Sequence, residues 1–113
     1  MSSLLSFSEK PDDIVGINNN IYSLIVPRAI AHASDAADAE EIRQSQFVGG
    51  ISFDLFSPER RGRLAEAVRL GIQDFKSQVE AGDPLERPVD PGVIEKLDEA
   101  LRLFDRFKSH SED

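Results

Sequence analysis

The sequence predicts an all-α fold, a compact bundle of about four helices that ends in an antiparallel helical hairpin. Two stretches carry this prediction: residues 58–81 and 91–108 each place apolar side chains on one helical face, and a proline-containing connector separates them. With 113 residues, of which 40% are hydrophobic, the chain can build one core, so we expect a single domain over residues 1–113. We expect residues 1–11 and 109–113 to be flexible ends.

The two helices of the second half have clear start and stop signals. Ser57 is a suitable N-cap with Pro58 at the first helical position, and Gly82 is a suitable C-terminal residue for a helix over 58–81. Gly71 lies beside the apolar stripe of that helix and leaves room for another helix to come close. Asp90 is a suitable cap for the second helix.

A further helix is predicted between Asp35 and the glycine pair Gly49-Gly50. Asp35 supplies an N-cap, the glycines supply a stop, and the intervening residues are rich in alanine and glutamate. Ile42 and Phe47 are its larger apolar residues.

The segments before and after this helix allow two interpretations. Residues 21–30 fit a helix bent at Pro27, although the composition of residues 21–26 also suits a strand. Residues 51–55 alternate between apolar and polar side chains, as is typical of a short strand, and residues 4–7 are a third strand candidate. The alternative to the all-α fold is therefore an α+β fold with a small two- or three-stranded sheet in the N-terminal half.

Composition excludes several classes of function. The net charge is −8, from 21 acidic and 13 basic residues, which disfavours binding to nucleic acid or to an anionic membrane and favours a basic protein partner. The chain has no cysteine, and therefore no disulfide or thiolate metal site. It shows no secretory leader and no apolar run of the roughly 20 residues that span a bilayer, so we expect a cytoplasmic protein.

No motif for catalysis or cofactor binding is present. There is no nucleophile elbow, no threonine and no phosphate-binding glycine loop, so we expect neither an enzyme nor a cofactor. His32, Asp35 and Asp38 are the strongest metal candidates, but Ser34-Asp35 resembles a helix boundary that would separate them. We therefore expect no metal site.

Arg60, Arg61 and Arg63 break a local rule, because the first turns of a helix disfavour cations. Such a cluster can place guanidinium groups for an anion or an acidic partner. It can also be neutralised by nearby acids on a solvated face, with Glu59 and Glu66 as the closest in sequence.

These observations predict a non-enzymatic protein-binding domain that blocks a basic partner. Small, acidic chains of this type resemble bacterial immunity proteins and other stoichiometric inhibitors, in type and not through any aligned motif. The acids expected to be exposed and to steer the partner are Asp35, Asp38, Glu40, Glu41 and Asp54.

A helical homo-oligomer is the alternative function. Apolar residues cover more than a third of the circumference of the C-terminal helix, which indicates either burial on two sides or contact with a second copy. In the second case a homodimer would form through Leu103 and Phe107.

Overall fold

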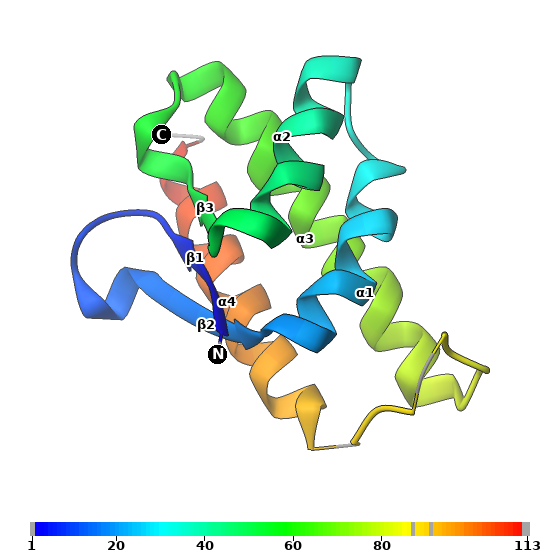
Figure 1. Cartoon of the computed structure of the whole chain (residues 1–113). Coiled ribbons are helices and arrows are strands. Elements are labelled where there is room, and N and C mark those ends of the chain that lie inside the picture. The colour runs from blue at the N-terminus through cyan, green and yellow to red at the C-terminus, as the bar shows by residue number, and fades with distance from the viewer. Residues whose placement is uncertain (1, 87, 91, 112–113) are drawn as a thin grey trace.

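Three β-strands and four α-helices make up the described part of the chain, so the fold is α+β (Figure 1). The computed structural model describes residues 2–86, 88–90 and 92–111. The elements are β1 (Ser2–Ser6), β2 (Ile14–Asn18), α1 (Asn19–Ile30), α2 (Ala36–Val48), β3 (Gly50–Ser52), α3 (Pro58–Ala81) and α4 (Val93–Ser111). The all-α prediction is therefore wrong, and the alternative with a small N-terminal sheet is confirmed.

The sheet has the order β2-β1-β3, with the first strand of the chain at its centre. β1 runs antiparallel to β2 and parallel to β3, and Leu5 pairs with Val15 on one side and with Ile51 on the other. Residues 2–6 of the expected flexible end at 1–11 form β1, which is paired with a strand on each side, and the flexibility of this end stays a prediction. At the other expected flexible end, α4 continues to Ser111, and residues 112–113 lie outside the described residues.

The predicted ends of α2 and α3 are confirmed, whereas the helix expected from residue 91 begins at Val93 in the structure, and residue 91 lies outside the described residues. The Ser57 hydroxyl accepts the amide of Arg60 at 3.4 Å, and Gly82 ends α3 in the left-handed region at φ 72°. Asp35 caps α2, which ends at Gly49 with φ 90°. The helix expected over residues 21–30 is α1, which runs through Pro27.

α3 and α4 form the predicted antiparallel hairpin. Lys76 contacts Asp98 at 2.5 Å and Glu66 contacts Lys108 at 3.8 Å, so residue numbers rise along one helix as they fall along the other. Figure 1 shows α4 behind the sheet, and its buried residues Leu97, Ala100, Leu103 and Phe104 share one hydrophobic core with β1, β2 and α3. The wide apolar face of α4 is therefore explained by burial on two sides.

Gly71 allows α1 and α3 to cross in contact. A Cβ atom at Gly71 would lie 2.6 Å from the backbone nitrogen of Ala29 and 2.7 Å from its Cα. The close helix approach predicted at this glycine is thus confirmed.

Candidate functional site

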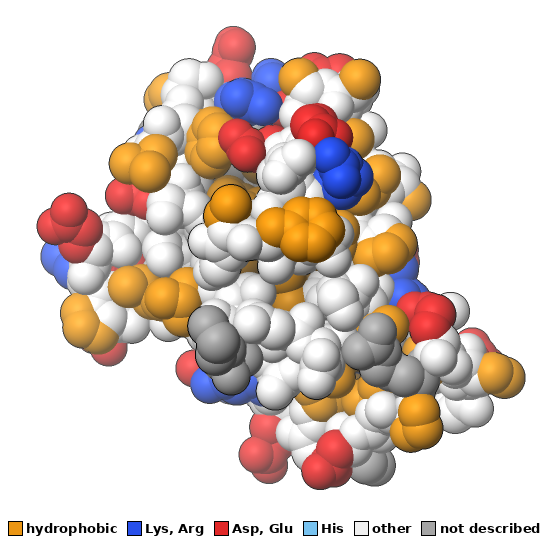
Figure 2. Space-filling model, in the orientation of Figure 1, with side chains coloured by type: hydrophobic (Ala, Val, Ile, Leu, Met, Phe, Trp, Pro, Cys, Tyr) orange, Lys and Arg blue, Asp and Glu red, His pale blue; other side chains and the backbone are white. Residues whose placement is uncertain are grey.

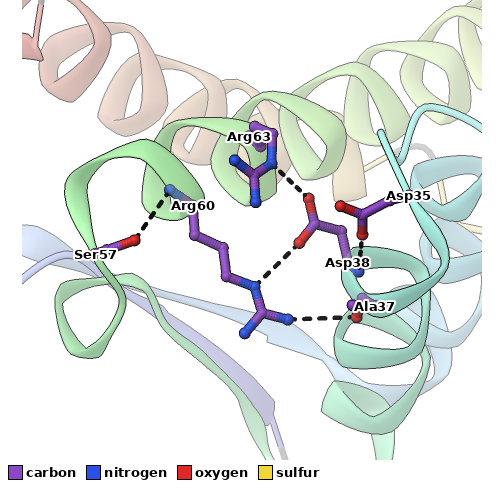
Figure 3. A network of polar contacts seen from close by, with 6 residues as sticks. All are labelled: Asp35, Ala37, Asp38, Ser57, Arg60 and Arg63. Atoms are coloured by element: carbon purple, nitrogen blue, oxygen red, sulfur yellow. Dashed lines mark hydrogen bonds and ion pairs between the residues drawn. The ribbon is translucent and has the colours of Figure 1, made fainter.

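Two of the three clustered arginines bind a buried carboxylate inside the protein (Figure 3). The Nε atoms of Arg60 and Arg63 donate to the two oxygens of Asp38, at 3.1 and 3.0 Å. The Asp38 side chain is only 2% exposed, so the expectation of an exposed, partner-steering Asp38 is wrong. The predicted alternative, that acidic side chains neutralise the arginines, is confirmed for Arg60 and Arg63. The acid is Asp38 of α2, however, and not the Glu59 or Glu66 named from the sequence.

The two capping residues align the helix starts that meet in this cluster. The side chain of Asp35 accepts a hydrogen bond from the amide of Asp38 at 2.8 Å, and that of Ser57 accepts one from the amide of Arg60 (Figure 3). The buried carboxylate therefore comes from the first turn of α2, and its two arginines come from the first two turns of α3. Burial by itself would raise the pKa of Asp38, but hydrogen bonds and charge from Arg63 and Arg60 outweigh it and hold the pKa below its usual value. Asp38 is therefore an anion that ties α2 to α3.

Arg61 points to a different set of partners. Its Nε donates to the carbonyl of Phe53 at 3.1 Å, and its Nη2 donates to the carbonyls of Asp54 at 3.3 Å and Phe56 at 3.1 Å. These bonds secure the 3-10 helix Phe53–Leu55, which follows β3 where the sequence predicted a continuous strand. Arg61 thus has a structural role in the turn between β3 and α3.

α2 is attached to the rest of the molecule mainly through polar side chains. Its buried residues are Asp38, Ile42 and Ser45, of which only Ile42 is apolar. The Ser45 hydroxyl lies 2.7 Å from the Tyr22 hydroxyl of α1 and donates to the Ile42 carbonyl at 2.5 Å. Burial raises the pKa of Tyr22 to about 12, although the hydrogen bond with Ser45 acts in the opposite direction.

We expect Tyr22 to titrate near pH 12 in the folded protein and near pH 10 after unfolding. Because the folded-state pKa is the higher one, the contribution of neutral Tyr22 to stability is complete below pH 10 and is lost as the pH rises toward 12. The chain has one tyrosine and no tryptophan, so phenolate absorbance measures this residue alone. Tyr22→Phe should remove that alkaline loss, whereas a folded protein that titrates near pH 10 would contradict the buried position.

Large apolar side chains are exposed at the end of α2 and beside it. The most exposed are Phe47 (70%), Val48 (75%) and Leu55 (80%), and Leu4 of β1 is 48% exposed. The amide of Leu4 donates to the carbonyl of Gly49 at 2.8 Å, which places β1 against the end of α2. Figure 2 shows apolar side chains at the surface where the end of α2 meets β3 in Figure 1. We call Leu4, Phe47 and Val48 the apolar face; Leu55 is exposed on the 3-10 helix Phe53–Leu55 that follows β3.

The remaining predicted acids differ in their availability to a partner. Glu40 is exposed but binds Arg43, which together with Gln44 lowers the pKa of Glu40 to about 2. Glu41 and Asp54 are half-buried, and within the described ranges their carboxylates have no hydrogen-bond or ion-pair partner. Asp35 is exposed and caps α2.

The residues predicted for self-association lie against the protein's own core. Leu103 is 7% exposed, and the half-buried Phe107 stacks on Phe7 with 4.4 Å between ring centroids. The prediction that Leu103 and Phe107 are both exposed for contact with a second copy of the chain is therefore wrong. His32, considered above for a metal, lies 2.6 Å from Asp74, and the described residues hold no group of three or more His, Asp or Glu able to bind a metal ion.

Sequence reasoning missed the apolar face. The sequence pattern predicts Phe47 only as an apolar residue of its helix, and it does not single out Val48. The available signal was that Phe47 and Val48 are adjacent and immediately precede a glycine stop, so that one helix end cannot direct both into the core.

Across the described residues, no helix combines the length and apolar character required to cross a bilayer. Comparison of the chain with protein-family models, curated proteins and solved structures found no match.

Proposed function

We propose that this chain is a non-enzymatic protein-binding domain that docks through the apolar face. The observation that carries the proposal is the exposure of two consecutive large apolar residues, Phe47 and Val48, on a helix whose other exposed residues are mostly polar. Exposed apolar clusters of this kind are typical of interaction sites, and burying each side chain fully contributes about 1.5–3 kcal/mol. Aromatic residues are also enriched among those that dominate binding energy.

The charge around the apolar face favours a basic partner. Glu41 lies on α2, two turns before Val48 and on the same side of the helix, and Asp54 lies on the 3-10 helix that follows β3. Their carboxylates, together with Asp35, can steer a cationic surface toward the face at low ionic strength. A stoichiometric inhibitor of a basic protein fits this arrangement, and its cytoplasmic location stays a prediction.

The decisive test is capture of a partner by tagged protein from a native lysate, with bound proteins identified by mass spectrometry at low and moderate salt. The double variant Phe47→Ser/Val48→Ser should reduce affinity for the partner by about tenfold or more. The matched control Gln73→Ser/Ala81→Ser places two serines at exposed positions of α3 and should bind like the wild type. Equal capture by both double variants would contradict the proposed face.

A second pair of variants tests the charge. Glu41→Lys/Asp54→Lys should weaken binding and remove most of its salt dependence, because surface charges act over about one Debye length. The control Glu95→Lys/Asp83→Lys makes the same change in net charge at exposed positions outside the face. If both pairs weaken binding equally, net charge alone is responsible. Recovery of only a second copy of the chain would replace the proposal by self-association through the apolar face.

A further inference from the structure

A pocket of about 420 Å³ lies between the first half of α3 and the last half of α4. One wall is a stripe of α3 in steps of three and four residues, and the other wall comes from α4, with Phe7 at one end. The residues are Phe7, Pro58, Arg61, Gly62, Ala65, Glu66, Arg69, Phe104, Phe107 and Lys108. Its size is within the usual range for small-molecule sites.

The apolar part of the pocket is a fixed aromatic cluster. Phe7 stacks on Phe107, and its ring meets the edge of Phe104 with 5.2 Å between centroids. Phe7 and Phe104 are buried in the core, so their positions are set by the fold. Phe7 lies between Phe53 and Phe107, with 4.8 and 4.4 Å between ring centroids. The apolar surface that the pocket offers to a ligand therefore comes from the half-buried Phe107 and Ala65 and from the exposed Pro58.

The polar part of the pocket is cationic, although the protein as a whole has a net charge of −8. It contains Arg61, Arg69 and Lys108, against one carboxylate, that of Glu66. Glu66 is bound by Arg69 through two hydrogen bonds, of 2.9 and 2.5 Å, and lies 3.8 Å from Lys108. Arg61 donates to backbone carbonyls, and in the described part of the chain none of its bonds goes to a carboxylate.

Gly62 keeps the pocket open without being needed for packing. A Cβ atom built on Gly62 would have nothing within 4 Å. Glycine inside a helix is less favourable than alanine, so the fold by itself favours a side chain here. In contrast to Gly71, whose missing side chain is required for the contact with α1, Gly62 has no neighbour that excludes a side chain, and it lines the open space of the pocket.

We propose that this pocket binds a small amphipathic anion: an acyl or aryl group that lies against Pro58, Ala65 and Phe107, with a carboxylate attracted by the cations that line the pocket, Arg61, Arg69 and Lys108. The two fixed arginines provide planar donors of the kind that carboxylates accept. The excess of cations over anions in a low-dielectric groove attracts the head group. This site is independent of the protein-binding function proposed above.

Isothermal titration with decanoate and phenylbutyrate tests the proposal and separates an acyl from an aryl ligand by their relative affinity. Each probe should bind in a one-to-one ratio, and decanol, which has the chain but no charge, should bind at least about tenfold more weakly than decanoate. Absence of binding by both carboxylates at low millimolar concentration would overturn the proposal. Equal binding of decanol and decanoate would overturn the anionic part of it.

Two matched pairs of variants locate the site. Gly62→Leu should abolish binding without lowering the midpoint of thermal unfolding, because the new side chain enters open space, whereas Gly62→Ala should have a much smaller effect on affinity. Lys108→Gln should weaken binding by up to about fivefold, the range for an exposed ion pair. Lys96→Gln, on the same helix and outside the pocket, should have no effect. Binding that survives Gly62→Leu would place the ligand elsewhere.

Discussion

Gly71→Ala should destabilise the protein, by about 2 kcal/mol, the middle of the range for overpacking a close contact. The new Cβ atom would lie 2.6 to 2.9 Å from the backbone nitrogen, Cα and Cβ of Ala29. Two of the three are backbone atoms of Ala29, near the C-terminal end of α1, so relief requires that this end of α1 moves away from α3. The better helix propensity of alanine, about 1 kcal/mol, offsets only part of this cost.

The control for this prediction is the same substitution nine residues earlier in the same helix. Gly62→Ala adds a Cβ atom with no neighbour within 4 Å, so it should stabilise the protein by roughly 0.5–1 kcal/mol. Urea unfolding followed by circular dichroism measures both changes. Two glycine-to-alanine changes of the same sign would contradict the packing at Gly71.

Asp38→Asn should have the second large effect and lower the free energy of unfolding by about 2 kcal/mol at neutral pH. The two carboxylate oxygens each accept from one arginine, and in asparagine one of them is replaced by an NH2 group, which faces an arginine donor and cannot accept from it. Removing one partner of a fully buried ion pair costs more, but the Arg60 and Arg63 side chains are 32% and 40% exposed and can be solvated by water.

The effect of Asp38→Asn should depend on pH in a defined direction. The folded-state pKa of Asp38 is below its unfolded value, so its contribution is complete above the unfolded pKa of about 4 and is lost as the pH falls through the folded pKa. Wild type and variant should therefore converge in stability as the pH is lowered from 6 toward 2. Urea midpoints across this range measure the convergence, and a constant difference would show that Asp38 acts without its charge. Glu41→Gln, at a half-buried position on the same helix, is the control and should change stability little at any pH.

Helix ends were predictable because their signals are local. The caps at Asp35 and Ser57 and the stops at Gly49 and Gly82 act on backbone groups within one turn, and a single sequence contains all of that information. The sheet was not predictable in the same way. β2 is five residues long and carries Gly16 at its centre, and β1 pairs with β3 across more than 40 residues, so no local pattern specifies either partner.

In the candidate site too, the local features were predictable from the sequence and the contacts between distant residues were not. The unfavourable placement of Arg60 and Arg63 was visible in the sequence, but their partner Asp38 is 22 and 25 residues away, and the crossing of α2 and α3 brings them together. Asp38 was predicted to be exposed because aspartate in the first turn of a helix is ordinarily solvated. The exposure of Phe47 was missed because apolar character by itself does not show which side of a helix faces the core.

The polar attachment of α2 has a consequence for the order in which the molecule opens. Segments with few buried apolar contacts reach open states at a lower free energy than the global unfolding transition. α2 contributes one buried apolar side chain, Ile42, and its other two buried side chains are Asp38 and Ser45. Its amide hydrogens should therefore exchange through local opening before those of α3. Phe47 and Val48 of the apolar face belong to α2, so a partner that binds the face also stabilises the packed state of α2. The affinity of that partner is therefore reduced by the free energy needed to keep α2 packed.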